Sequence, residues 1–244
     1  MRIAVIGTGR MGAVLGARLA GAGHEVRMGS RAPDRGRARA TEVGAARGGG
    51  YRDVLPGADV AILAVPWAAA RETLLAFGDL DRTILVDVTN PFPETSSGGS
   101  GKRSDSSGAE QLQAAAPRAR LVKAFNTLSS ALLRKPPDFA GTAPTIFVAG
   151  DDGAAKDAVA GLVACLGYEP VDAGALSSAR YLESLAGLMI TLDRLADGRT
   201  EHALELLRRP RAVTQLRSAG RAEKRLGVPP RSTDRPRSTA ALSR

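Results

Sequence analysis

The stretch that decides the fold is Arg2-Ile3-Ala4-Val5-Ile6-Gly7-Thr8-Gly9-Arg10-Met11-Gly12, close to the start of the 244-residue chain. A short apolar run that stops at a glycine is typical of a buried strand. From Gly7 the residues follow the pattern GxGxxG, and an Ala- and Leu-rich stretch with helical spacing comes next. Strand, glycine turn and helix in this order predict a dinucleotide-binding unit. The alternative is a tight turn with no ligand.

Each glycine of this turn has a separate predicted role. Gly7 permits the tight turn, Gly9 lets the backbone approach a pyrophosphate, and Gly12 lets the helix pack closely on the strand. The start of the helix supplies free N–H groups and the positive end of the helix dipole. The turn therefore favours an anionic, phosphate-containing ligand.

Strand-like and helix-like stretches alternate along most of the remaining chain. This alternation predicts an α/β fold, a Rossmann-type doubly wound parallel sheet with helices on both faces. We expect strands at 2–6, 25–28, 60–65, 83–88, 120–124, 145–149 and 169–172, and helices at 11–22, 34–46, 68–77, 109–115, 153–166 and 176–195.

The net charge of +9 is confined to the end of the chain. Residues 208–244 hold eleven basic and two acidic residues, whereas residues 1–207 hold 23 of each. The main body therefore has no basic field that would indicate a specific nucleic-acid partner. The tail is rich in Pro, Ser and Thr and lacks aromatics, so we expect it to be disordered. A solvated appendage is favoured over non-specific contact with a polyanion.

The composition excludes several classes of protein. With one cysteine, Cys165, the chain forms no internal disulfide and no cysteine zinc site, and we expect this side chain to be buried in the core. Two histidines leave little for a metal centre, so none is predicted. No apolar run approaches the roughly 18 residues of a membrane helix, and the first run is too short for a signal peptide. We therefore expect a cytoplasmic protein that does not enter a membrane.

The end of the second strand indicates which dinucleotide is preferred. Chains that prefer NAD carry Asp or Glu there, about 20 residues after the glycine motif, to bind the ribose 2′-hydroxyl. Here Ser30 takes that place and Arg31 follows it, with Arg35 close by. A carboxylate would repel a 2′-phosphate, whereas a hydroxyl and a guanidinium bind one. The pattern predicts NADP(H) over NAD(H); the alternative is that Arg31 only begins a solvated loop.

Six motifs, taken together over residues 1–209, resemble the F420-dependent NADP oxidoreductases. They are IGTGRMG from Ile6, MGSR from Met28, AVPW from Ala64, VKAFNT from Val122, VAGDD from Val148 and DAGALSSARYLESL from Asp172. The resemblance implies an NADP-dependent oxidoreductase that exchanges hydride between NADP(H) and the deazaflavin coenzyme F420. It also implies a small-molecule second substrate and a homo-oligomer.

The resemblance further implies where the nucleotide binds. It places the pyrophosphate on Gly7, Thr8, Gly9, Arg10, Met11 and Gly12, the 2′-phosphate on Ser30 and Arg31, and the ribose and nicotinamide near Val65, Pro66 and Trp67. Trp67 is alternatively a packing anchor. The implied organisation is an NADP-binding Rossmann domain at 1–175, a small helical part at 176–209 that completes the substrate cleft, and the basic tail at 210–244.

Five residues are candidates for binding the second substrate. Asn90 and Asn126 follow strands whose ends face the ligand crevice of such a sheet, although Asn126 alternatively stabilises a turn. Gly174 and Gly187 would let a flat ring approach the backbone. Arg180 is a candidate partner for the anionic deazaflavin; its alternative is a salt bridge with Glu183 or Asp172.

No catalytic acid or base is predicted. Hydride transfer between two rings depends mainly on their positioning, and the redox chemistry belongs to the cofactors. The chain lacks a central histidine and a Tyr-x-x-x-Lys pair, which disfavours a carbonyl reductase that protonates an alkoxide. The alternatives are an NADPH-dependent reductase of an imine, a flavin or a ferric chelate, or a non-catalytic NADP(H)-binding redox sensor.

Deletion of the tail separates the enzyme from the sensor. If the protein is an enzyme, removal of residues 210–244 leaves its turnover nearly unchanged, because the predicted site lies before residue 210. Steady-state assays of the shortened and full chains check this. Loss of function with intact nucleotide binding would instead favour a sensor that contacts partners through the tail.

Overall fold

The computed structural model describes residues 1–78, 80, 83–92, 106–198 and 200–209. The predicted disordered tail lies outside these residues. Met1–Leu206 form one compact unit, which contains all of the helices and strands described below.

The unit is built on one sheet with the strand order β3-β2-β1-β4-β5-β6-β7-β8 in the described part of the chain. The strands are β1 (Arg2–Ile6), β2 (Glu25–Gly29), β3 (Arg47–Gly49), β4 (Val60–Leu63), β5 (Ile84–Asp87), β6 (Arg120–Lys123), β7 (Thr145–Gly150) and β8 (Glu169–Asp172). The helices are α1 (Arg10–Gly21), α2 (Pro33–Val43), α3 (Tyr51–Val54), α4 (Trp67–Leu75), α5 (Gly108–Ala115), α6 (Ser130–Leu133), α7 (Gly153–Cys165), the 3₁₀ turn η1 (Leu176–Ser178) and α8 (Ala179–Leu195).

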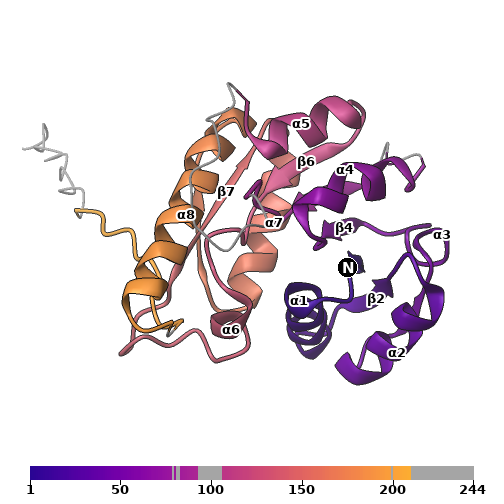
Figure 1. The fold of residues 1–244 in the computed structure, drawn as a ribbon, viewed down its shortest axis with the longest axis horizontal. Coiled ribbons are helices and arrows are strands. Elements are labelled where there is room, and N and C mark those ends of the chain that lie inside the picture. Colours follow the sequence, from indigo (N-terminus) through magenta and orange to yellow (C-terminus); the bar gives the residue numbers. More distant parts are fainter. Residues whose placement is uncertain (79, 81–82, 93–105, 199, 210–244) are drawn as a thin grey trace, which may run out of the picture. The chain divides into compact units, whose positions relative to one another are not determined.

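Two apolar cores cover the two faces of this sheet. Successive side chains of a strand point to opposite faces, so in β1 Ile3 and Val5 join one core and Ala4 and Ile6 join the other. The first core includes side chains of α1, α6 and α7, and the second includes side chains of α4, α5 and the start of α8. Figure 1 shows α4 and α5 above the strands and α1 and α6 below them. The predicted Rossmann-type α/β fold is confirmed.

The first six strands are parallel, and the chain changes direction of winding between β1 and β4. Ligands of such sheets bind at the carboxyl ends of the strands, at this switch point. The sheet is not parallel throughout, however, because β7 runs antiparallel to β6 and β8 follows β7. The turn after β8 therefore follows a strand that runs opposite to β1–β6.

Three short elements differ from the sequence-based expectation. β3 was not predicted because its Arg47-Gly48-Gly49 sequence resembles a turn. Its glycines are needed because α2 packs on it backbone to backbone: a Cβ at Gly48 would lie 2.1 Å from the carbonyl oxygen of Gly36. The single turns α3 and α6 were also not predicted, since four residues are too few for a recognisable period.

The C-terminal part is less helical than expected. α8 ends at Leu195, where Asp197 and Gly198 adopt left-handed conformations (φ 55° and 74°), and residues 200–209 contain no helix. Cys165 is also exposed rather than buried, because it lies in the last turn of α7 on the side facing His24. Among the described residues, no helix is long and apolar enough to cross a membrane.

Candidate functional site

The glycine turn between β1 and α1 has the geometry that its sequence predicts. Gly7 has a φ of 125°, and a Cβ there would lie 2.1 Å from the carbonyl oxygen of Ala64. A Cβ at Gly12 would lie 2.0 Å from the carbonyl oxygen of Gly7. A Cβ at Gly9 would meet no described atom within 4 Å. Packing thus requires Gly7 and Gly12, whereas Gly9 borders open space.

The first turn of α1 is suited to an anion. Within the described residues, no side chain caps its N-terminus at Gly9, and no acidic residue lies in the turn. The backbone N–H groups there remain available, and the helix dipole favours negative charge. Thr8 and Arg10 border this terminus, with Arg10 exposed and Met11 half-buried. The cradle fits a dinucleotide pyrophosphate.

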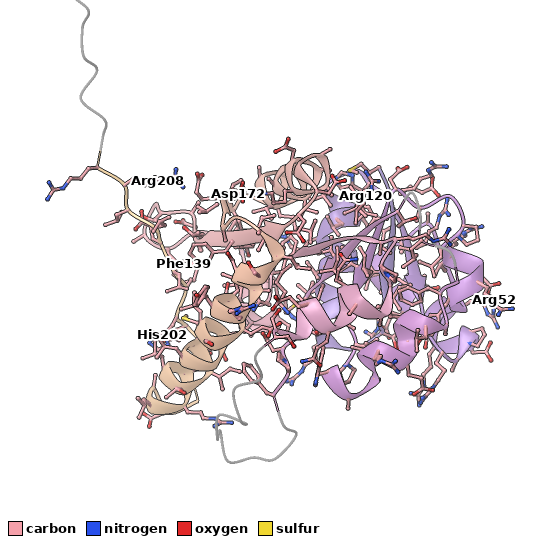
Figure 2. All side chains as sticks on the ribbon, turned by 90° about the horizontal axis from the view of Figure 1, so that it is seen from above. Arg52, Arg120, Phe139, Asp172, His202 and Arg208 are labelled. Carbon is pink, nitrogen blue, oxygen red and sulfur yellow. The ribbon has the colours of Figure 1, made fainter. Side chains whose placement is uncertain are left out.

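The end of β2 presents a hydroxyl and exposed cations. Ser30 is buried, and its Oγ accepts a hydrogen bond from the Ala32 N–H at 3.3 Å, which leaves the hydroxyl proton free to be donated. Arg31 and Arg35 are exposed, and within the described residues neither forms an ion pair. Arg52 of α3 also projects outward (Figure 2), close to this edge because β3 pairs with β2; it was not predicted as a site residue.

Trp67 stands at the end of β4 and begins α4. Its N-terminal neighbours are Val65, which is half-buried, and Pro66, which is exposed and caps the helix. The half-buried indole ring lies against Gly108 at the start of α5, where an added Cβ would be 3.0 Å from ring atoms Cη2 and Cζ3. Trp67 therefore packs on α5, as its alternative interpretation required, and is still partly exposed at the carboxyl edge.

The two predicted asparagines lie together after β5 and β6. Asn126 Nδ2 donates to Asn90 Oδ1 at 3.0 Å and to the carbonyl oxygen of Leu182 at 3.0 Å, while Asn90 Nδ2 donates to the carbonyl oxygen of Asn126 at 2.9 Å. The preceding residue, Phe125, is buried with a φ of 61°, which is unusual for a bulky residue. Strained backbone persists mainly where function needs it, so this turn is a strong candidate for ligand contact.

The other three acceptor-site candidates differ in how well they are placed. Gly187 lies five residues after Leu182 on α8, and a Cβ there would be 3.6 Å from the ring of Phe92. Gly174 lies in a turn after β8, where its N–H donates to Asp172 and its carbonyl oxygen accepts from the Gly150 N–H. Arg180 pairs with Glu110 of α5 at 2.9 Å, so a salt bridge does form, although not with either of the expected partners.

A buried charge cluster was not predicted. Lys123 at the end of β6 donates from Nζ to Asp87 Oδ2 at 2.9 Å, to Glu183 Oε1 at 3.0 Å and to the carbonyl oxygen of Thr89 at 2.5 Å. The sequence offered one signal for this cluster: the apolar strands β5 and β6 each end in a charged residue, Asp87 and Lys123. It did not reveal Glu183, which α8 brings in from 60 residues further along the chain.

Known proteins that resemble this chain are NADP-dependent oxidoreductases, which fits the nucleotide cradle described for it. The model of the coenzyme F420-dependent NADP oxidoreductase family matches residues 2–91. The F420-dependent NADP reductase of Methanothermobacter thermautotrophicus is 33% identical over 213 residues, which cover 79% of this chain and 89% of that protein. The chain belongs to the F420-dependent NADP oxidoreductase family. The family resemblance and the prediction of an NADP-dependent oxidoreductase are confirmed.

Two further relatives show how far the likeness extends. A crystal structure from Arthrobacter sp. FB24, provisionally assigned as an F420-dependent NADP reductase, superposes on this family member with a TM-score of 0.77 and 33% identity, covering 85% of this chain and all of that one. The metalloreductase STEAP3 of Rattus norvegicus is 29% identical over 185 residues. This match covers 75% of the present chain but only 36% of STEAP3.

Proposed function

We propose that this protein transfers hydride between NADP(H) and coenzyme F420. The observation that carries the proposal is the 33% identity to an F420-dependent NADP reductase along 89% of that protein. The nucleotide cradle and the strand-end turns lie at the one edge where such a sheet binds ligands, which supports the same conclusion.

The nucleotide is assigned to the carboxyl ends of β1, β2 and β4. The N-terminus of α1 would bind the pyrophosphate and Gly9 would lie against it, while Arg31, Arg35 and the Ser30 hydroxyl would bind the 2′-phosphate. Val65, Pro66 and Trp67 would border the ribose and nicotinamide. Bound NADPH supplies the hydride, so the chain's task is to orient the ring and exclude water.

The acceptor is assigned to the ends of β5 and β6 and to α8. The turns that Asn90 and Asn126 hold together would border the polar edge of the ring, and the lack of a side chain at Gly187 would let a flat ring approach α8. Arg180 and Gly174 have less support as ligand contacts, because Arg180 is engaged by Glu110 and Gly174 by its own turn.

A spectroscopic assay with purified protein, NADPH and oxidised F420 tests the function. We expect rapid loss of the deazaflavin absorbance with NADPH and a rate lower by on the order of 100-fold with NADH, since a charge-assisted hydrogen bond contributes about 1.5–3 kcal/mol. A ferric chelate in place of F420 is the control suggested by the STEAP3 match. Tight NADPH binding with no transfer to F420 would contradict the proposal.

Two further expectations remain proposals. We expect a homo-oligomer, as the family resemblance implies, and a cytoplasmic location. Light scattering of the purified protein and fractionation of the producing cells would check them.

A further inference from the structure

Asp87, Lys123 and Glu183 are buried charges for which the assignments above give no role. Asp87 and Lys123 are register partners on β5 and β6 and are fully buried, and Glu183 of α8 is 6% exposed. Removing three charges from water is costly, and apolar residues in place of such a cluster are often neutral or stabilising. Stability alone therefore does not account for the cluster.

Glu183 joins α8 to the start of α5. Its Oε2 accepts from the Gly108 N–H at 2.9 Å, and its Oε1 accepts from the Ala109 N–H at 3.2 Å as well as from Lys123 Nζ. These N–H groups belong to the first turn of α5 and have no partner within their own helix. The carboxylate also lies at the positive end of the α5 dipole. Glu183 thus fixes the N-terminus of α5 from outside.

Gly108 links this contact to Trp67. A Cβ at Gly108 would lie 3.0 Å from two atoms of the indole ring and 3.2 Å from Glu183 Oε1. The carboxylate, the backbone of α5 and the indole ring therefore follow one another in direct contact. A small shift of the α5 terminus would move the ring.

The same cluster fixes the turn that carries Asn90. Asp87 Oδ1 accepts from the Thr89 N–H at 2.8 Å and from the Thr89 hydroxyl at 2.7 Å, while Lys123 holds the Thr89 carbonyl oxygen. Residues on both sides of the assigned hydride-transfer site are thus held by one set of buried charges.

We propose that Glu183, oriented by Lys123, is a positioning residue that sets the place of the Trp67 ring at the nucleotide site. This inference rests on the proposed function, in which Trp67 borders the nicotinamide. Small displacements of the reacting groups are costly in hydride transfer, since a misplacement of about 1 Å lowers a rate by on the order of 100-fold.

Glu183→Gln tests the proposal, with Glu42→Gln as its matched control. Gln keeps the length of the side chain but replaces one acceptor oxygen with an NH₂ group, which is a donor. This NH₂ group then faces another donor, either an α5 N–H group or the Lys123 ammonium. Glu42 also pairs with an arginine, Arg39, but on the exposed surface of α2. Trp67 is the chain's one tryptophan, so its emission maximum and its energy transfer to saturating NADPH report on the ring directly.

We expect Glu183→Gln to shift both fluorescence signals and to lower kcat by about 10- to 100-fold, with the Kd for NADPH changed by less than about threefold. Glu42→Gln should change kcat by less than about twofold, as for an exposed pair. Unchanged fluorescence in Glu183→Gln, or equal effects in both variants, would overturn the proposal.

Gly108→Ala is a second test that keeps all three charges of the cluster, and it decides the matter if Glu183→Gln fails to fold. The added methyl group presses on the ring and on Glu183, and we expect the same fluorescence shift and a fall in kcat. Unchanged fluorescence would overturn the proposal. If the parent protein does not reduce F420, the proposed function fails, and energy transfer from Trp67 to bound NADPH still tests the positioning role.

Discussion

Replacing Arg31 by Glu should weaken NADPH binding by on the order of 100-fold, because a charge-assisted hydrogen bond of about 1.5–3 kcal/mol is lost and a carboxylate then faces the 2′-phosphate. Binding of NADH should change by less than about threefold, since the 2′-hydroxyl of its ribose can donate a hydrogen bond to a carboxylate. The variant should therefore prefer NADH over NADPH or bind both about equally.

Energy transfer from Trp67 to the reduced nicotinamide measures both affinities in the same protein. Arg37→Glu is the matched control: it makes the same charge change on α2, at a side chain that already pairs with Asp34. We expect less than about a threefold effect there, because exposed charges are largely screened at physiological salt. Equal losses of NADPH and NADH in Arg31→Glu would rule out the 2′-phosphate assignment.

The carboxyl edge was predictable from the sequence because its signals are local. Gly7, Gly9 and Gly12 are spaced within one turn, and Ser30 with Arg31 occupies a fixed place after the second strand. The place of Asn90 and Asn126 at this edge was predictable because parallel strands all end at the same edge of a sheet. Their mutual hydrogen bonds show that this rule held for β5 and β6.

The features that the sequence did not predict depend on contacts between distant segments. β3 contains glycines because α2 packs against its backbone, and a glycine run by itself indicates a turn. The reversal at β7 means that Gly174 follows a strand that runs opposite to β1–β6, and apolar periodicity does not report strand direction. Lys123 is buried because Asp87 and Glu183 surround it, and only the folded chain brings α8 to the end of β6.

Gly9→Val and Gly12→Ala should separate nucleotide binding from folding. A side chain at Gly9 meets no described atom within 4 Å, and its φ of −74° is ordinary. Gly9→Val should therefore unfold at nearly the parent temperature, yet bind NADPH about 10- to 100-fold more weakly, because an overpacked contact costs about 1–3 kcal/mol.

Gly12→Ala should instead lower the unfolding temperature. Its methyl group would lie 2.0 Å from the Gly7 carbonyl oxygen, so the strand and helix must separate, with an expected fall of on the order of 5–10 °C. Gly161→Ala in α7 is the control, since its Cβ meets nothing within 4 Å among the described residues and alanine favours a helix by about 1 kcal/mol. Thermal unfolding and NADPH titration of the three variants check this. If Gly9→Val lost stability as Gly12→Ala does, or bound NADPH as the parent does, Gly9 would not border the pyrophosphate.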